Sequence, residues 1–317
     1  METVTCNLCG SADHTFLYEM PDRFFFPDEY FKVVQCNHCG LGYVNPRPSF
    51  NEMQKYYPWD EEVFRCRKRP QKRYAAQAKY LREIEQRDGL KRLLDIGCAE
   101  GDFPRFMMAR GWNVEAVETS TLAPRIRDFK VYSQAFDEIP VMGPSYDAIT
   151  AWDVMEHVHD PMAYFRKAAT VLKPGGLFVF NVPNLNSLAS RFLFSQDVPR
   201  ELYFFTEETV RRYLASAGLR PLKAEYNDKL LHMVPVNWLR YVIKTKIKGE
   251  PFYFRDRHLT RIEWRNRNRL KPGFFSDVRY AVSVPDALVE QMLMPLITRV
   301  QIMRGTFSVC TYVAAKL

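Results

Sequence analysis

Four cysteines near the N-terminus have the spacing of metal ligands. They form two C-x-x-C pairs, each followed by a glycine, with 26 residues between the pairs. Two thiolates on one tight turn can face a single ion, and two such turns supply the tetrahedral set that zinc prefers. Two disulfides are the alternative, which a cytoplasmic chain disfavours. We therefore predict a structural zinc site formed by Cys6, Cys9, Cys36 and Cys39.

A glycine-bearing turn in the middle of the chain has the composition of a ligand-binding loop. Gly97 and Gly101 follow the apolar run that begins at Arg92, and they let the backbone approach a ligand closely. Glu118 ends the next apolar run, where a carboxylate can accept hydrogen bonds from two ribose hydroxyls. The dinucleotide pattern G-x-G-x-x-G is absent. We therefore predict a site for a different cofactor that contains a ribose.

A histidine after a later apolar run is the candidate general base. The imidazole of His157 titrates near neutral pH, so it can accept the proton of a hydroxyl nucleophile. Two alternatives stay open at this point. Glu156 and His157 could be a hydrogen-bonded pair that holds the loop, or His159 could be the base.

The segments that must position these groups alternate between the apolar pattern of a strand and that of a helix. Apolar runs of strand length are separated by stretches with helical spacing, which predicts an α/β fold with a parallel sheet and helices on both faces. Ligands of such sheets bind at the carboxyl ends of the strands. The predicted strands are 92–97, 113–118, 146–151, 177–182, 220–225 and 306–313, the predicted helices are 73–87, 102–110, 161–172 and 206–217, and residues 173–176 are a predicted turn.

Composition excludes several classes of protein. The chain has 317 residues, of which 47% are hydrophobic and 26% charged, so it is neither disordered nor fibrous. No apolar run reaches the roughly 18 residues of a transmembrane helix, and the polar N-terminus does not resemble a signal peptide. We therefore expect a cytoplasmic protein of about two domains.

Several of these segments together resemble a known family. Leu94 to Gly101 is similar to the first motif of class I S-adenosylmethionine-dependent methyltransferases, and Val117 to Ser120 is similar to their ribose-binding segment. Residues 150–161 resemble the fourth-strand motif of the subgroup that includes the ubiquinone-biosynthesis O-methyltransferase, and 172–184 resemble its fifth-strand region. The likeness covers about residues 90–227, with Ala99 where the family often has a third glycine.

The resemblance implies a Rossmann-like sheet, S-adenosylmethionine as cofactor and a set of residues that bind it. Among these residues, Cys98 has a second interpretation as a small buried side chain, and Trp152 has one as a core residue. The catalytic residue stays His157. The implied cofactor-binding residues are Asp95, Gly97, Cys98, Gly101, Glu118, Thr119, Ala135, Phe136, Trp152 and Asp153.

The predicted organisation has four parts. Residues 1–48 are a zinc ribbon, 49–89 a linker and helix, 90–227 with 304–317 the cofactor-binding domain, and 228–303 an insertion. The insertion contains two amphipathic stretches, with Pro235 and Pro295 as predicted kinks. A helical lid packed on the core is the favoured interpretation of 230–303, and peripheral contact with the inner face of the membrane is the other.

The positive charge of the chain is concentrated in the insertion. The net charge is +8, but residues 229–271 carry 12 basic and 3 acidic residues, which leaves −1 for the remainder. We therefore expect an anionic acceptor or an anionic surface that carries it.

The expected reaction is methyl transfer to a hydroxyl of a nucleotide- or lipid-linked sugar or glycan precursor. A four-cysteine ribbon ahead of this domain resembles bacterial methyltransferases of sugars and polysaccharide precursors. A quinone, phenol or lipid O-methyltransferase is the alternative. A nucleic acid substrate is disfavoured, because Asp153 to Glu156 lacks the Pro-Pro of base-methylating enzymes.

Overall fold

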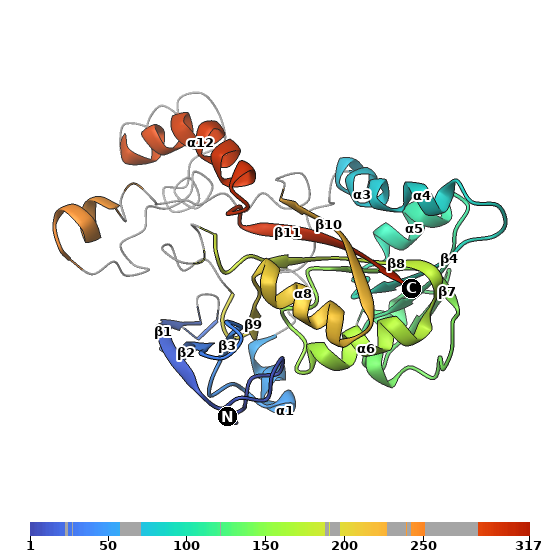
Figure 1. Ribbon diagram of the computed structural model, residues 1–317, viewed down its shortest axis with the longest axis horizontal. Coiled ribbons are helices and arrows are strands. Elements are labelled where there is room, and N and C mark those ends of the chain that lie inside the picture. The colour runs from blue at the N-terminus through green and yellow to red at the C-terminus, as the bar shows by residue number, and fades with distance from the viewer. Residues whose placement is uncertain are drawn as a thin grey trace. The chain divides into compact units, whose positions relative to one another are not determined.

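The computed structural model (Figure 1) divides into two compact units, which we describe separately. The first contains Met1–Leu185, Gln196–Leu231 and Val309–Leu317, and the second contains Asn186–Ser195 and His232–Ser308. The structure describes residues 1–22, 25–26, 28–57, 71–120, 122–187, 190, 197–226, 239, 242–250 and 285–317.

A seven-stranded sheet forms the centre of the first unit. Its order is β10 (Leu219–Tyr226), β11 (Val309–Lys316), β8 (Leu172–Pro183), β7 (Tyr146–Trp152), β4 (Arg92–Ile96), β5 (Asn113–Val117) and β6 (Lys130–Tyr132). The strands from β8 to β6 are parallel, and β11 is antiparallel to both of its neighbours. The predicted α/β class with a Rossmann-like sheet is confirmed.

Two predicted strand boundaries are wrong. The last strand begins at Val309 rather than at Thr306, because the main-chain N–H of Thr306 still bonds to the oxygen of Gln301 at the end of a helix. Residues 173–176, predicted as a turn, lie within β8, which begins at Leu172 opposite Tyr146 and passes through a register shift.

Helices cover both faces of this sheet (Figure 1). Along β8, Leu177 and Val179 belong to the apolar cluster beneath the helices of one face, whereas Phe178 and Phe180 contact Phe165 from the other face. This alternation is the period of two expected of a strand buried on both sides. The first face holds α3 (Gln71–Ala78), the 3-10 turn η2 (Lys79–Leu81), α4 (Arg82–Glu85) and α5 (Asp102–Met108), and the second holds α6 (Pro161–Val171) and α8 (Glu207–Ser216).

Side-chain caps fix where the helices of the second face begin. Asp160 accepts a hydrogen bond from the N–H of Ala163 at 3.0 Å, and Thr206 accepts one from Thr209 at 3.2 Å. These bonds satisfy donors that the first helical turn leaves unpaired. The predicted helix 73–87 is divided into α3, η2 and α4, and short 3-10 turns lie at η3 (Ala123–Arg125) and η4 (Phe136–Glu138).

A second sheet connects the N-terminal module to the part of the unit that contains the seven-stranded sheet. Its order is β1 (His14–Pro21), β2 (Tyr30–Cys36), β3 (Gly42–Val44) and β9 (Tyr203–Phe204), all antiparallel. A side chain at Gly42 would come within 3.1 Å of Phe204 Cβ, so glycine lets β9 approach. The sequence did not predict β9. Helix α1 (Phe50–Met53) and the turn η1 (Gln54–Tyr56) follow the module.

The second unit contains two described helices. These are the short π-helix η5 (Ile243–Ile247) and α12 (Pro285–Met303), which includes Pro295. Most of the first amphipathic stretch, with Pro235, lies outside the described residues. Among the helices that the structure describes, none has both the length and the apolar character needed to cross a membrane.

Candidate functional site

The four N-terminal cysteines converge as predicted. The turn after β2 brings Cys36 and Cys39 to the first pair, with Cys6 Sγ 3.3 Å from Cys39 Sγ and Cys9 Sγ 3.5 Å from Cys36 Sγ. All four sulfurs lie within 4.8 Å of one another, and none is in a disulfide. A tetrahedral zinc with bonds of about 2.3 Å separates its sulfurs by about 3.8 Å, so the cluster fits that ion.

The glycine turn lies between the carboxyl ends of β4 and β5. The backbone has positive φ at Gly97, Ala99 and Gly101. A side chain at Gly97 would come within 2.6 Å of Val154 Cγ2, so only glycine fits there. Glu118 closes the turn, because its carboxylate accepts the N–H of Ala99 at 2.8 Å. The turn and the acid therefore lie side by side, and the carboxylate keeps lone pairs for ribose hydroxyls.

Asp95 lies beneath this turn rather than on the surface. It is 2% exposed, and Thr150 Oγ1 donates a hydrogen bond of 2.6 Å to Asp95 Oδ1. Burial away from water raises the pKa of Asp95 to about 7, and the charge of Glu118 adds to the shift. A cationic group bound at the turn would favour the ionised carboxylate.

Asp153 begins the loop after β7 in a left-handed conformation, with φ of 59°. The amide of Asn181, in β8, accepts from the N–H of Asp153 at 2.8 Å and donates to its Oδ1 at 2.5 Å. Arg73, in α3, donates to its Oδ2 at 2.8 Å. Sequence reasoning missed Arg73, which lies far from Asp153 along the chain and in no recognised motif. It placed Asn181 in the segment 172–184 that resembles the fifth-strand region, but it assigned that residue no role.

The remaining predicted cofactor residues differ in how they can contact a ligand. Phe136 is fully buried edge-to-face against Tyr164, and Cys98 packs with Ala116 and Ile126 as the predicted small buried residue. Ala135 is half-buried and Thr119 is exposed at the end of β5. The structure thus brings Ala135 and Thr119 to the surface while Cys98 and Phe136 turn their side chains inward.

Trp152 packs in the core of the sheet domain. Its ring lies edge-on to Phe103 at 5.8 Å and near Tyr80 at 6.3 Å. Its Nε1, Arg73 Nε and the buried Gln77 Oε1 have no hydrogen-bond partner among the described residues. Gln77 follows Arg73 by one helical turn, so these unpaired polar groups share one face of α3.

His157 lies in the same loop as Asp153, with its ring partly accessible. Its Nδ1 is 2.9 Å from the main-chain oxygen of Arg200, and the hydroxyl of Tyr57 is 3.4 Å from the same nitrogen. Burial lowers the pKa of His157. Glu156 Oε1 is 4.0 Å from His157 Nε2, which is longer than a hydrogen bond, so the structure does not contain the bonded pair considered as an alternative.

Arg200 connects His157 to the N-terminal module. Its guanidinium is buried and donates to Asp22 at 2.7 Å, to Asp197 at 2.6 Å and to the main-chain oxygen of Tyr56 at 2.9 Å. A buried arginine needs such partners, since an unpaired charge away from water is strongly unfavourable. Asp22 and Arg200 are separated by 178 residues, and no sequence signal pairs them.

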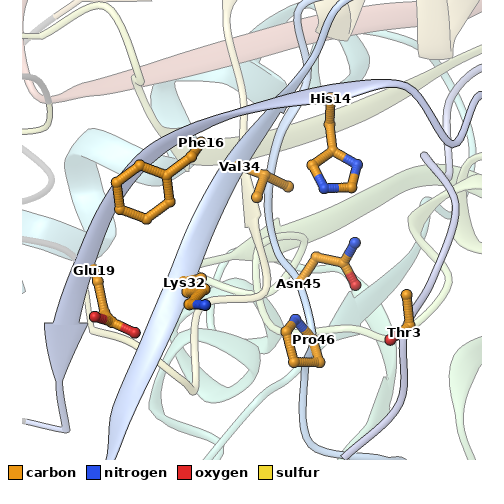
Figure 2. A pocket seen from close by; sticks show the side chains of 8 residues that line it. All are labelled: Thr3, His14, Phe16, Glu19, Lys32, Val34, Asn45 and Pro46. Carbon is orange, nitrogen blue, oxygen red and sulfur yellow. The ribbon is translucent and has the colours of Figure 1, made fainter.

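A hollow of about 610 Å³ opens on the outer face of the ribbon sheet (Figure 2). Glu19 on β1 is paired in register with Lys32 on β2, and the two side chains lie next to each other. None of the predicted cofactor or catalytic residues lines this hollow. Its lining residues are Thr3, His14, Phe16, Glu19, Lys32, Val34, Asn45 and Pro46.

The residues at the carboxyl edge of the parallel strands fit S-adenosylmethionine. Two carboxylates, Asp95 and Glu118, lie at this edge and could accept hydrogen bonds from an ammonium and a ribose diol, and the turn of Gly97 to Gly101 would admit a ligand against its backbone. The unpaired Arg73 Nε and Gln77 Oε1 add polar groups suited to a zwitterionic ligand.

Comparison with known proteins agrees with this chemistry. Residues 67–224 match the family model described as a methyltransferase domain. A ubiquinone biosynthesis O-methyltransferase from Ralstonia nicotianae is 28% identical over 178 residues, covering 47% of this chain and 74% of that protein. One of the same name from Ruegeria pomeroyi is 30% identical over 166 residues, covering 46% of this chain and 65% of that protein. The match to a Vibrio parahaemolyticus relative spans 49% of that protein.

Two solved methyltransferase structures are similar to this chain. A SAM-dependent methyltransferase from Archaeoglobus fulgidus has a TM-score of 0.46 at 17% identity, covering 77% of this chain and 94% of that one. Geranyl diphosphate C-methyltransferase from Streptomyces coelicolor has a TM-score of 0.45 at 17% identity, covering 77% and 79%. The family match and the sequence relatives, together with the glycine turn and its two carboxylates, establish that the chain belongs to the class I S-adenosylmethionine-dependent methyltransferases.

Proposed function

We propose that the chain transfers a methyl group to a hydroxyl of an anionic sugar or glycan precursor, carried on a nucleotide or a lipid. The observation that supports a hydroxyl acceptor is the hydrogen bond of His157, which fixes the ring nitrogen that carries the proton. Arg200 offers a carbonyl oxygen, which can only accept, so the proton of the imidazole resides on Nδ1 and Nε2 holds the free lone pair.

The lowered pKa of His157 supports its role as a base. A neutral imidazole is required to accept a proton, and burial favours that form at neutral pH. The ring remains partly accessible, with 29% of its side-chain surface exposed, so an acceptor can reach Nε2. The Asp153 loop, fixed by Asn181 and Arg73, precedes it by four residues and lies at the same strand edge.

Each residue then has one task in the reaction. The cofactor, when bound, supplies a methyl group already activated for displacement. Asp95, Glu118 and the glycine turn would hold it, and the chain would orient the acceptor hydroxyl for attack. His157 Nε2 would take the proton that the hydroxyl loses as its oxygen bonds to the methyl carbon and the bond from that carbon to the cofactor sulfur breaks.

The proposed acceptor class rests on the positive charge of residues 229–271 and on the resemblance of a ribbon-bearing chain to methyltransferases of sugar precursors. The excess of positive charge in residues 229–271 favours an anionic acceptor such as a sugar diphosphate. A quinone or phenol acceptor is the second candidate, because the relatives described above carry the name of an O-methyltransferase of ubiquinone biosynthesis. Phenols and sugar hydroxyls both need a base, so the position of His157 suits either.

A labelling experiment decides between these acceptors. Purified enzyme with methyl-labelled S-adenosylmethionine is given separate sugar-nucleotide, lipid-linked sugar, phenolic and RNA fractions. We expect label in a sugar fraction, removed by a glycosidase or phosphatase digest that releases the sugar. Label in the phenolic fraction alone would favour the second candidate, and label in RNA alone would overturn both.

We also propose that the ribbon binds zinc through Cys6, Cys9, Cys36 and Cys39. Four thiolates leave no open position, so the ion has a structural role. Metal analysis of the purified protein should find one zinc per chain. Cys36→Ser should lower that ratio, whereas Cys310→Ser, which alters a buried cysteine outside the cluster, should leave it unchanged.

A further inference from the structure

Helix α12 in the second unit has its polarity inverted relative to an ordinary surface helix. Glu290 and Gln301 are buried, at 2% and 5% exposed, whereas six large apolar side chains are exposed. These six recur at intervals of three or four residues, with one adjacent pair, and so form a stripe along one side. The stripe consists of Val289, Met292, Leu293, Leu296, Val300 and Met303.

A contact within the same unit explains which side of α12 faces inward. The main-chain N–H of Leu239 donates to Glu290 Oε1 at 2.9 Å, so the buried carboxylate of the helix has a partner inside the unit. The apolar stripe therefore remains for a partner outside the unit. Exposed apolar patches of this kind mark sites of protein or membrane contact.

Basic side chains of the same unit indicate the kind of partner. On η5 and just after it, Lys246 and Lys248 are exposed on either side of Ile247, which is 73% exposed. Arg299 and Arg304 are exposed on and after α12. Among the side chains of this unit whose exposure the structure describes, Glu250 is the one exposed acidic group, against these four basic ones.

We propose that α12 and η5 dock on an anionic phospholipid bilayer. The apolar stripe would lie in the plane of the interface, with the lysines and arginines against phosphate headgroups. Two copies of this basic surface would repel each other across a two-fold axis, which argues against self-association as the cover for the stripe. The proposal goes beyond the methyl-transfer function and does not depend on which acceptor is methylated.

Flotation with vesicles tests the proposal on the full chain. We expect the protein to float with vesicles of phosphatidylcholine mixed with phosphatidylglycerol, less so with phosphatidylcholine alone, and less at high salt. The double variant Met292→Glu/Leu296→Glu should weaken this binding by about tenfold or more. Lys246→Glu/Lys248→Glu should remove the preference for phosphatidylglycerol.

Met142→Glu is the matched control, because Met142 is an 81% exposed methionine in the first unit. It should bind vesicles as the unaltered protein does, and circular dichroism should show all variants folded. The proposal is overturned if the protein floats with neither vesicle, or if Met292→Glu/Leu296→Glu binds unchanged. It is also overturned if that variant instead converts a dimer to a monomer, since the stripe would then cover a second copy. Methyl transfer to a soluble acceptor, measured on Met292→Glu/Leu296→Glu and on Met142→Glu, should stay unchanged and reports the proposed function separately.

Discussion

The imidazole Nδ1 of His157 lies 2.9 Å from the main-chain oxygen of Arg200, and this bond leaves Nε2 as the basic nitrogen. Replacing His157 by Ala should lower kcat by about two orders of magnitude or more while leaving the Kd for S-adenosylmethionine unchanged. Steady-state kinetics and calorimetric titration measure the two quantities. His159→Ala is the matched control, because His159 bonds to the Pro48 oxygen instead and should retain most activity. Equal losses in both variants would contradict the assignment.

Arg200→Lys should affect both stability and the pH profile. Lysine keeps the positive charge but loses the fork that joins Asp22 and Asp197, so we expect a loss of about 3 kcal/mol in the free energy of unfolding. Burial lowers the pKa of His157, so a loosened cluster should raise that pKa. The acid limb of kcat/KM should then move to higher pH, because the imidazolium cannot act as base.

Several charged groups face His157 and enter this pH profile. Glu156 and Asp153 belong to its own loop, and Asp197 lies beside Arg200. Because Arg200→Lys leaves these carboxylates in place, a shift in the acid limb reports hydration of the imidazole. Arg110→Lys is the control, since Arg110 forms a similar two-bond pair with Glu85 elsewhere in the unit. A shift of the same size in Arg110→Lys would contradict the interpretation.

Cofactor affinity should depend on the ionisation of Asp95. The pKa of this buried carboxyl is raised to about 7, and only its ionised form can pair with the cofactor ammonium. The affinity should therefore fall as the pH drops below 7, by up to about tenfold per pH unit. Calorimetric titrations at several pH values measure this slope. In Asp95→Asn the affinity should be lower and the slope flat; a retained slope would assign it to another group.

Ala99 holds a left-handed conformation that glycine adopts more easily. Its φ is 50°, and the strain of a Cβ there is about 1–2 kcal/mol, of which the greater flexibility of glycine offsets about 0.5–1 kcal/mol. Ala99→Gly should therefore raise the free energy of unfolding by up to about 1 kcal/mol. Ala75→Gly, at an exposed position in the middle of α3, should lower it. Denaturant titrations measure the free energy of unfolding of both variants. If both substitutions changed it in the same direction, the strain argument would be refuted.

Removing the metal should abolish methyl transfer as well as unfolding the ribbon. The N–H groups of Leu202 and Tyr203 donate to the main-chain oxygen of Glu156, so the segment that completes the ribbon sheet also holds the His157 loop. A zinc chelator should lower both the thermal midpoint and kcat, and added zinc should restore them while magnesium should not. Full activity after complete zinc removal would show that the folded ribbon is not needed to hold the His157 loop.

The sequence predicted those parts of the site that are local. The apolar runs located the strands, Thr206 located the start of α8, and the glycine turn followed by Glu118 indicated where a cofactor would lie. Contacts between distant segments left no such signal. The bond between His157 and Arg200, the ion pair of Arg200 with Asp22, and the two-residue strand β9 each depend on tertiary packing. Short strands have too few residues to show a period.

The contribution of β9 to the ribbon sheet has a consequence for biosynthesis. Strand β3 ends at Val44, but its antiparallel neighbour begins at Tyr203. During translation the β3 edge of the ribbon sheet therefore stays unpaired until well over a hundred further residues have emerged from the ribosome. An open edge is a template for wrong pairing, which makes this interval the stage at which the nascent chain is most exposed to aggregation.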